Sequence, residues 1–232
     1  MTTESDLVFL FDVDNTLLDN DHVQKDLAAH LEKEFGDNSQ KLYWQLFEEL
    51  RSELGYADYL GALQRYRRHE MYNPQMLRMS SFLVDYPFAE RVYPGALEAV
   101  AHVRRFGRTA ILSDGDVVFQ PRKVERSGLW KAFDGHVLIY IHKEQELDNV
   151  AQSFPARHYV LVDDKLRILT AVKNTWGDRV TTVFPRQGHY ALDEKEVAKY
   201  PAADVTLDSI GELADPKLDT LWASLRGRPG AA

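Results

Sequence analysis

The sequence has no cysteine, which excludes disulfide bonds, a thiol nucleophile and thiolate metal ligands. It also has no apolar run near the roughly 20 residues that a helix needs to cross a bilayer. The first residues, MTTESD, show neither a basic start nor an apolar segment of the kind that begins a secretory leader. From these absences we expect a soluble protein of the cytoplasm.

Basic residues are the smaller charged group: 28 Lys and Arg stand against 36 Asp and Glu, for a formal net charge of -8. Nucleic acids and anionic membranes attract basic surfaces, so we expect neither as a partner. An anionic substrate would have to be attracted by a local cation. The hydrophobic share of 44% is sufficient for the core of a globular protein of 232 residues.

The stretch from Leu7 to Leu18, LVFLFDVDNTLL, joins an apolar run to a pair of acids. The run is rich in branched and aromatic residues, which is typical of a strand buried on both faces of a parallel sheet. Asp12 and Asp14 follow it, and an extended backbone would point both carboxylates to the same side of the strand end. Two such carboxylates repel each other, so the pair indicates a metal ion, a general acid or both. A plain alternative is that residues 12–16 form a polar turn that caps the next helix.

The rest of the chain divides into a helical block and an alternating part. Residues 19–87 have apolar residues at helical spacing and no strand pattern, which predicts helices. From Tyr93-Pro94-Gly95 onward, short apolar runs alternate with helical patterns, which indicates βαβ units and a parallel sheet. The expected strands are 7–11, 109–112, 137–141, 158–162, 180–184 and, more weakly, 205–207; the expected helices in this part are 96–106, 121–127, about 144–154 and about 166–175.

These patterns predict the α/β class. We expect a Rossmann-like core with a parallel sheet, formed by residues 1–18 and 88–232, and an inserted α-helical cap domain formed by residues 19–87.

Polar residues stand at the ends of four expected strands. They are Asp12 with Asp14, Ser113, Lys143, and Asp163 with Asp164. The carboxyl ends of parallel strands share the edge of the sheet at which ligands bind, so these residues can meet in one cleft. Each also has a plain explanation: a turn or cap for Ser113, a solvated surface for Lys143, and helix capping for the acids 163–164.

Together these residues have the chemistry for phosphoryl transfer. A carboxylate such as Asp12 can act as a nucleophile and form an aspartyl-phosphate. Oxygen ligands from Asp12 and Asp163 suit Mg²⁺, and Lys143 with the Ser113 hydroxyl would face the phosphoryl oxygens. Asp14 is positioned to protonate the leaving alcohol and later to activate water.

The sequence resembles the haloacid dehalogenase superfamily, specifically its phosphatase branch, over nearly its whole length. The matching motifs are DVDNT at 12–16, Ser113 followed by Asp114-Gly115, Lys143, and VDD at 162–164. The helical block resembles the cap that many members carry there, which closes over the site and largely sets substrate choice. The resemblance implies Asp12 as nucleophile, Asp14 as acid/base with a backbone carbonyl that reaches Mg²⁺, Thr16 as support for this loop, Ser113, Asp114 and Lys143 at the substrate phosphate, Asp163 as metal ligand, and Asp164 as support for the metal site.

Two positions depart from the family pattern. Asn15 stands where many relatives have glycine, and Glu144 stands where many have proline after the lysine of the third motif. The second departure leaves Lys123 and Lys165 as alternatives for the phosphate-facing lysine. Asp114 adds a negative charge near the expected phosphate, which would weaken anion binding unless the carboxylate points away or pairs with a cation.

The expected activity is Mg²⁺-dependent hydrolysis of a small-molecule phosphate monoester through an aspartyl-phosphate. A phosphotransferase or mutase of the same superfamily would use the same residues. A 2-haloacid dehalogenase is disfavoured by Asp14, since a halide leaves without a proton whereas an alkoxide needs one. An inactive relative that acts as a binding protein is a further alternative. The substrate and the oligomeric state are open from the sequence.

Overall fold

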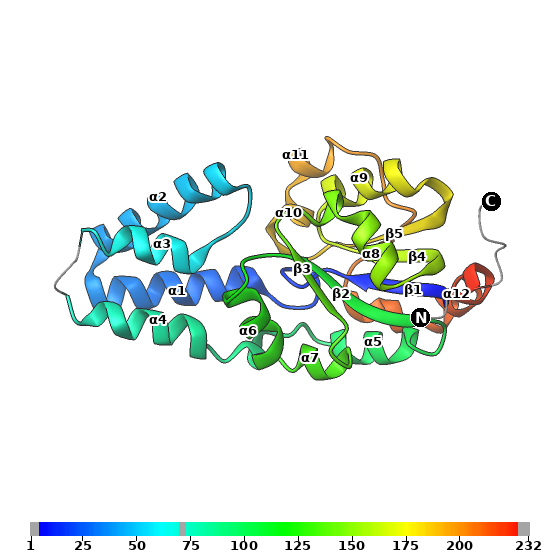
Figure 1. The fold of residues 1–232 in the computed structure, drawn as a ribbon, viewed down its shortest axis with the longest axis horizontal. Coiled ribbons are helices and arrows are strands. Elements are labelled where there is room, and N and C mark those ends of the chain that lie inside the picture. The colour runs from blue at the N-terminus through cyan, green and yellow to red at the C-terminus, as the bar shows by residue number, and fades with distance from the viewer. Residues whose placement is uncertain (1–4, 70–72, 227–232) are drawn as a thin grey trace.

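The fold is built on a six-stranded sheet in the order β3-β2-β1-β4-β5-β6 (Figure 1). The computed structural model describes residues 5–69 and 73–226. The strands are β1 (Ser5–Phe11), β2 (Arg108–Asp114), β3 (Val137–Tyr140), β4 (Ala156–Val162), β5 (Val180–Pro185) and β6 (Val205–Leu207). Each neighbouring pair is parallel. The α/β class and the Rossmann-like parallel sheet predicted from the sequence are thereby confirmed.

Helices cover both faces of the sheet in the alternating part of the chain (Figure 1). The α-helices of this part are α5 (Ala96–Val103), α6 (Phe119–Arg126), α7 (Leu129–Ala132), α8 (Leu147–Ser153), α9 (Leu166–Trp176), α10 (Gly188–Leu192), α11 (Glu194–Val197) and α12 (Asp219–Arg226). The 3-10 helices are η1 (Phe88–Arg91), η2 (Lys143–Gln145), η3 (Gly177–Arg179), η4 (Ile210–Ala214) and η5 (Pro216–Leu218). Across the described ranges, no helix is both long enough and apolar enough to span a membrane.

Strand β1 runs through the middle of the sheet and is buried on both faces. Val8 belongs to a hydrophobic cluster that includes residues of α8 and α9. Phe9 and Phe11 belong to a second cluster on the other face. There, Phe9 meets Trp222 of α12 edge to face at 5.5 Å, and Phe11 meets Phe133 at the same centroid distance. The alternation of side chains along the strand thus fixes β1 between two helical layers.

Four helices between β1 and β2 form a bundle beyond the carboxyl ends of the strands (Figure 1). They are α1 (Asn20–Phe35), α2 (Asp37–Leu54), α3 (Tyr59–Tyr66) and α4 (Gln75–Asp85). Buried residues recur at intervals of four along α1, at Val23, Leu27 and Leu31, which is the spacing of one helix face. The predicted helical character of this block is confirmed. Its division from the core at 18/19 and 87/88 stays a prediction.

The chain ends of the described core lie away from this bundle. The start of β1 lies beside the end of α12, where a carboxylate oxygen of Asp6 is 4.0 Å from the Nε of Arg226. In Figure 1 both elements lie at the end of the molecule opposite to α1–α4.

The helix expected from about residue 144 to 154 is divided in the structure. A 3-10 turn, η2, comes first, and α8 begins at Leu147. The amide of Lys143 donates a hydrogen bond of 2.7 Å to Asp114 Oδ1, which fixes the first turn to the neighbouring strand end. Local propensity is overridden here by a tertiary hydrogen bond, so the regular helix starts later than the sequence predicts.

Candidate active site

The ends of β1 and β4 bring two acids together at the centre of the sheet. Phe11 pairs with Val162, so Asp12 and Asp163 each come one residue beyond this pair. The Asp12 amide donates to the Val162 carbonyl at 2.9 Å, which continues the ladder past the strand. Both aspartates are buried. The adjacency expected from parallel strand ends is therefore present for these two residues.

Lys143 lies between these two acids. Its Nζ is 2.5 Å from Asp12 Oδ1 and 2.6 Å from Asp163 Oδ2, and it also donates to the Leu112 carbonyl at 3.3 Å. Burial alone would lower the pKa of this buried ammonium, but the carboxylates of Asp12, Asp163 and Asp114 raise the pKa well above its usual value. Lys143 is therefore a fixed positive charge at this edge of the sheet.

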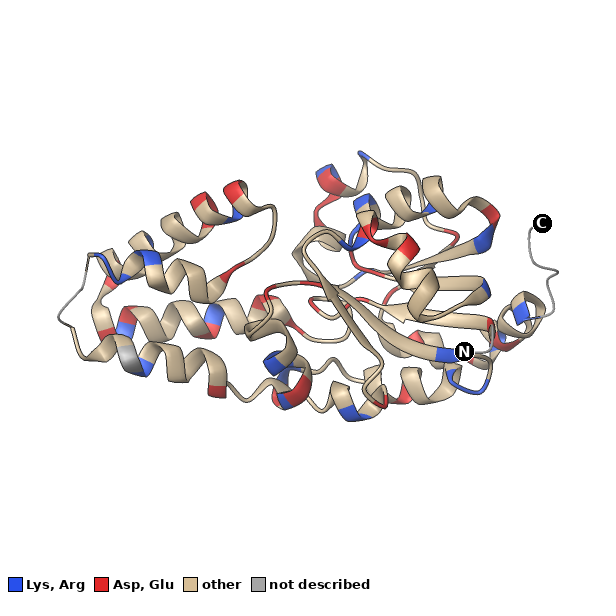
Figure 2. Cartoon of the chain, in the orientation of Figure 1, with Lys and Arg blue, Asp and Glu red and all other residues tan. Residues whose placement is uncertain are grey.

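Three buried carboxylates form a cluster at the same point. Oxygens of Asp12, Asp163 and Asp164 lie within 4.8 Å of one another. Burial raises the pKa of Asp163 to about 6 and raises the pKa of Asp164 well above its usual value. Asp12 Oδ2 and both carboxylate oxygens of Asp164 have no hydrogen-bond partner among the described residues. In Figure 2 acidic positions gather between the bundle and the sheet.

Such a cluster fits a hard divalent cation. Mg²⁺ prefers oxygen ligands, and buried carboxylates without partners are costly unless a cation compensates them. The family resemblance implied only a supporting role for Asp164, whereas the structure places its carboxylate within the cluster itself. Asp164 is thus a candidate ligand alongside Asp12 and Asp163.

The carboxylate of Asp14 is held apart from this cluster. Lys123 Nζ is 2.6 Å from Asp14 Oδ1 and donates a second bond of 3.0 Å to Asn20 Oδ1. Gln120 Nε2 lies 3.4 Å from the other oxygen of Asp14. The Lys123 side chain is fully buried, with its Nζ 5.8 Å from the ring centroid of Tyr59. Lys123 therefore binds the second acid of the first motif, and any contribution of Asp14 to a metal site would come from its backbone carbonyl.

Ser113 and Asp114 of the second motif form hydrogen bonds with neighbouring residues of the site. Ser113 is buried, and its Oγ accepts a hydrogen bond of 3.0 Å from Gln120 Nε2. The Asp114 carboxylate accepts the bond from the Lys143 amide, and burial raises the pKa of this carboxyl. The negative charge of Asp114 is thus partly offset by the N–H group that it binds. This hydrogen bond would reduce the repulsion between Asp114 and a bound anion.

The loop after Asp12 is supported by two side chains. Thr16 Oγ1 accepts a hydrogen bond of 3.0 Å from the Asp164 amide, which ties the first motif to the fourth. Asn15 has φ 62, a left-handed conformation that asparagine tolerates better than most residues and glycine tolerates best. This conformation explains why Asn15 can replace the glycine of many relatives.

Asn15 also contacts two polar side chains that no sequence motif marks, Asp21 and His189. Asn15 Nδ2 donates to Asp21 Oδ1 at 2.9 Å, and the same oxygen is 2.6 Å from His189 Nδ1. Gly188 makes this approach feasible, because a Cβ at that position would lie 2.4 Å from the Asn15 Cβ. No periodic pattern or motif marks Gly188 and His189, so neither residue could be identified from the sequence.

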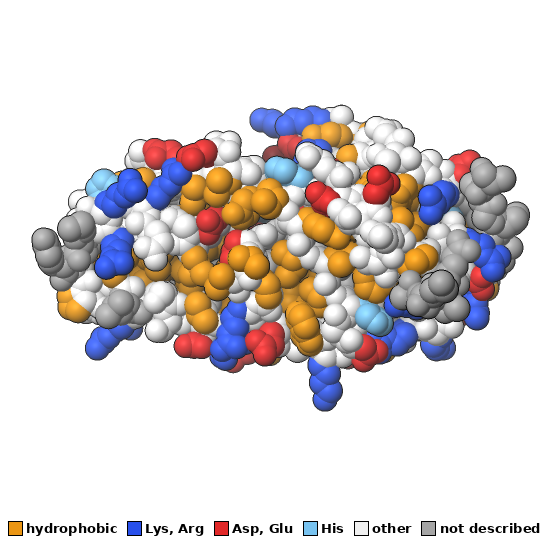
Figure 3. Space-filling model, viewed as in Figure 1, with side chains coloured by type: hydrophobic (Ala, Val, Ile, Leu, Met, Phe, Trp, Pro, Cys, Tyr) orange, Lys and Arg blue, Asp and Glu red, His pale blue; other side chains and the backbone are white. Residues whose placement is uncertain are grey.

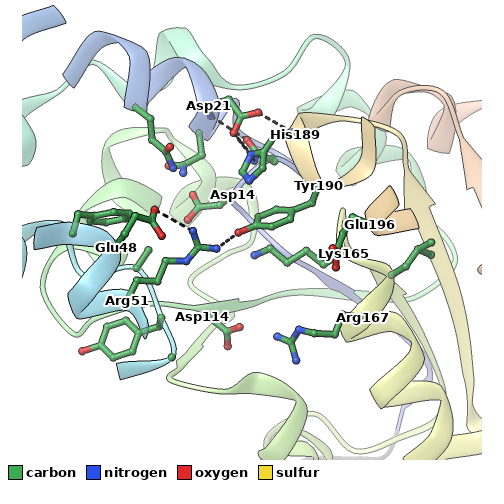
Figure 4. Close-up of a pocket in the computed structure, with 18 of the residues that line it drawn as sticks. Asp14, Asp21, Glu48, Arg51, Asp114, Lys165, Arg167, His189, Tyr190 and Glu196 are labelled. Atoms are coloured by element: carbon green, nitrogen blue, oxygen red, sulfur yellow. Dashed lines mark hydrogen bonds and ion pairs between the residues drawn. The ribbon is translucent and has the colours of Figure 1, made fainter. Parts of the chain in front are cut away.

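A cavity of about 1030 Å³ opens in front of these residues, between the bundle and the strand ends (Figure 4). Asp14 and Asp114 line it from the core. Arg51 of α2 reaches it from the bundle and donates a hydrogen bond to the Tyr190 hydroxyl of α10. Lys165 also lines the cavity, whereas Lys143 and Lys123 are buried behind it. The cavity has the size of a small-molecule binding site.

Comparison with known proteins identifies the family. Residues 7–174 match the family model of haloacid dehalogenase-like hydrolases. A crystal structure from Burkholderia xenovorans LB400, described as a haloacid dehalogenase-like hydrolase, has 65% sequence identity and a TM-score of 0.87, and the match covers 91% of this chain and 98% of that one. None of the curated proteins compared with the chain matches it.

More distant structures share the fold. A haloacid dehalogenase-like family hydrolase from Xanthomonas campestris has 17% identity and a TM-score of 0.65, with 97% of this chain and 95% of that chain covered. The L-2-haloacid dehalogenase from Xanthobacter autotrophicus has 21% identity and a TM-score of 0.60, with 92% and 98% covered. On the family match and the 65% identical relative, this chain belongs to the haloacid dehalogenase-like hydrolases.

Proposed function

We propose that the protein is a Mg²⁺-dependent phosphatase that hydrolyses a small-molecule phosphate monoester through an aspartyl-phosphate. The observation that carries this proposal is the second acid of the first motif. Asp14 follows Asp12 by two residues, lines the cavity and is held by Lys123 at 2.6 Å. A reaction that expels an alkoxide needs such an acid, whereas the expulsion of a halide does not.

The buried carboxylates supply the metal ligands in this proposal. Asp12, Asp163 and Asp164 would hold Mg²⁺ with their oxygens, together with the backbone carbonyl of Asp14. When bound, the ion neutralises charge on the phosphoryl oxygens. The unpaired oxygens of Asp12 and Asp164 support this assignment.

Residues of the protein perform the bond making and the proton transfers of the proposed reaction. Lys143 binds a phosphoryl oxygen and keeps Asp12 oriented. A carboxylate oxygen of Asp12 forms the bond to phosphorus while the bond from phosphorus to the ester oxygen breaks, and the leaving oxygen takes a proton from Asp14. Water then attacks the phosphorus of the aspartyl-phosphate and gives a proton to Asp14. Inorganic phosphate leaves and the Asp12 carboxylate is restored.

The helical bundle takes the role of a cap in this proposal, with residues 19–87 as the cap and the remainder as the catalytic core. Side chains of α2, including Trp44, Phe47 and Arg51, line the cavity opposite the strand ends. They would contact the leaving group and exclude water during the first step.

The test is release of inorganic phosphate from 4-nitrophenyl phosphate with Mg²⁺ and with a chelator. We expect turnover with Mg²⁺ only, and we expect Asp12→Asn to abolish it because the amide is a poor nucleophile. Activity in Asp12→Asn would remove the nucleophile assignment. Release of chloride from 2-chloropropanoate without release of phosphate would replace the proposal with the dehalogenase activity named for the Xanthobacter autotrophicus relative.

A phosphotransferase or mutase would use the same residues, so the site does not separate it from a hydrolase. The measurement that does so is transfer to an added sugar compared with release of phosphate to water. We expect release to dominate. Transfer that exceeds release would assign the chain to the transferases of this mechanism.

A further inference from the structure

We propose that the substrate carries a second anionic group on its leaving group and that Arg51 and Lys165 bind this group inside the cavity. The inference rests on the proposed phosphatase function and deepens it by naming the class of ester. The evidence is a pair of positive side chains, one from the bundle and one from the core, that both lie near the aromatic ring of Tyr190.

Lys165 contributes the core side of this pair. It directly precedes α9, and its amide donates to Asp163 Oδ1 at 2.8 Å, so its backbone is fixed next to the acid cluster. Its side chain lines the cavity, and Figure 4 shows it extending into the open space. Nζ is 5.1 Å from the centroid of the Tyr190 ring. Within the described ranges, this ammonium has neither a hydrogen bond nor an ion pair, so its N–H donors are available to a ligand. Burial alone would lower its pKa, but the carboxylates of Asp164, Asp12 and Asp163 in the acid cluster raise this pKa and are its nearest counter-charges.

Arg51 contributes the bundle side. Its Cζ is 5.8 Å from the centroid of the same Tyr190 ring, and its guanidinium donates to the Tyr190 hydroxyl. The nearest carboxylate of the described chain is Glu48 at 3.4 Å, whose side chain is 62% exposed. An ion pair with so exposed a partner is weak, so Arg51 retains most of its capacity for an anion. In Figure 4 Arg51 and Lys165 point toward each other across the cavity.

Most of the acids that line the cavity are already engaged with other groups. Glu144 is 2.6 Å from Arg167, and Asp21 is 2.6 Å from His189. Glu196 forms an ion pair with Lys199. Asp114 accepts from the Lys143 amide. These pairings leave Arg51 without full compensation from the cavity acids. The charge of Lys165 faces the acid cluster, whose carboxylates would be engaged by Mg²⁺ in the proposed enzyme. An anion between the two cations would then be favoured in this partly desolvated space.

The position of the pair separates it from the transferring phosphate. Lys143 lies between Asp12 and Asp163, and in the proposed reaction it binds an oxygen of the transferring phosphate. The cavity of about 1030 Å³ is much larger than a phosphate and continues to Tyr190 and the helices of the bundle. A leaving group with a terminal carboxylate or phosphate would extend from the acid cluster toward Arg51 and Lys165.

The experiment compares matched esters in a series of chain lengths. Straight-chain alkyl monophosphates of about two to five carbons are compared with their ω-carboxy and ω-phosphate analogues. kcat/KM is measured for the wild type, Lys165→Met, Arg51→Met and the control Lys131→Met, which removes an exposed charge outside the cavity lining. Affinity of the same esters for Asp12→Asn is measured by calorimetry, so that binding is tested even where turnover fails.

We expect at least one chain length at which the wild type has a kcat/KM about tenfold or more higher for the ω-carboxy or ω-phosphate ester than for the plain alkyl monophosphate. Lys165→Met and Arg51→Met should each reduce this preference by about ten- to hundredfold, the scale of a lost charge-assisted contact, and Lys131→Met should keep it. Absence of preference at every length, in both kcat/KM and affinity, overturns the proposal. The proposal is also overturned if Lys165→Met lowers kcat/KM equally for an alkyl monophosphate and for its ω-carboxy or ω-phosphate analogue. Lys165 would then act on the transferring phosphate or the acid cluster.

Failure of the proposed function gives a different result. In that case the wild type releases no phosphate from any ester with Mg²⁺. The calorimetric comparison still decides the anion site, because tighter binding of the ω-charged esters, lost when Lys165→Met or Arg51→Met is combined with Asp12→Asn, supports it without turnover.

Discussion

Lys143 and Lys123 each hold one of the two carboxylates that follow β1. Lys143 lies between Asp12 and Asp163, and Lys123 pairs with Asp14. Both ammonium groups are buried, so each carboxylate has a fixed partner of its own. Asp12 and Asp14 therefore pair with different lysines although a single residue separates them.

Replacement of Lys123 by methionine keeps an unbranched apolar stem but removes the partner of Asp14. We expect Asp14 to lose its fixed orientation and turnover to fall by about ten- to hundredfold, within the range of a weakened acid/base. The loss should be larger for an alkyl phosphate than for 4-nitrophenyl phosphate, whose leaving group hardly needs a proton. The measurement is kcat for both esters, with Lys131→Met as the control. Equal losses on the two esters would contradict the positioning role of Lys123.

Contacts between site residues could be predicted from the sequence wherever they depend only on the order and direction of the strands. Asp12, Lys143 and Asp163 follow the ends of parallel strands, and these ends lie at one edge of the sheet, so their meeting needs no knowledge of side-chain packing. Lys123 and Gln120 could not be placed in this way. Both lie within α6, and their contacts with Asp14 depend on how this helix sits against the loop after β1.

Among the elements, the strands and the longer helices were predictable and the short helices were not. Helices α7, α10 and α11 have four, five and four residues, which is too short for an apolar repeat at helical spacing. Helix α10 nevertheless brings His189 and Tyr190 to the cavity. Its position follows from tertiary contacts with α1 and α2, which a local pattern does not encode.

Substitution of Gly188 by alanine tests how α10 approaches the loop after Asp12. Gly188 has φ 71, and an added Cβ would meet the Asn15 side chain at 2.4 Å. Gly128 is a matched control, because it has φ 82 in the left-handed region but no atom within 4 Å of an added Cβ. We expect Gly128→Ala to lower the free energy of unfolding by about 1 kcal/mol and Gly188→Ala to lower it by about 1–3 kcal/mol more.

Only the Gly188 variant should also reduce kcat/KM, since Asn15 lies in the proposed nucleophile loop. Urea unfolding and phosphatase kinetics on both variants provide the measurement. Equal losses of stability, or unchanged kinetics in Gly188→Ala, would show that the approach to Asn15 has no role in the site.

At the scale of the molecule, an apolar cluster joins the bundle to the sheet. Aromatic rings follow one another from α2 to the core: Phe47 and Tyr59 at 4.8 Å, Tyr59 and Phe119 at 5.2 Å, and Phe119 and Phe88 at 5.7 Å. Figure 3 shows hydrophobic side chains along the boundary on this face and most charged ones around the rim. A ligand anion between Arg51 and Lys165 would add a polar link across the same boundary.

The stability of the whole chain should depend on pH through the acid cluster. Burial raises the pKa of Asp163 from 3.8 to about 6. The folded state then binds more protons than the unfolded state between these values, so the contribution of Asp163 is full below 3.8 and is lost as pH rises through about 6. Asp163→Asn removes this titration. We expect the free energy of unfolding of the variant, relative to the wild type, to rise by about 2–3 kcal/mol between about pH 4 and pH 7.

The measurement is urea unfolding of both proteins in a chelator across this range. Mg²⁺ at pH 7 should restore stability to the wild type and have little effect on Asp163→Asn, because binding to the folded state alone is stabilising. A difference between the two proteins that does not change with pH would contradict the assignment of the raised pKa to Asp163.

The contact between Asp6 and Arg226 places the beginning of β1 next to the end of α12, at the opposite pole from the helical bundle. An attachment made at either element, such as a fluorophore or a link to a sensor chip, stands far from helices α1–α4 (Figure 1). A molecule immobilised there presents its binding face to the solution, and a single tether design serves for every ligand in a surface-based affinity assay.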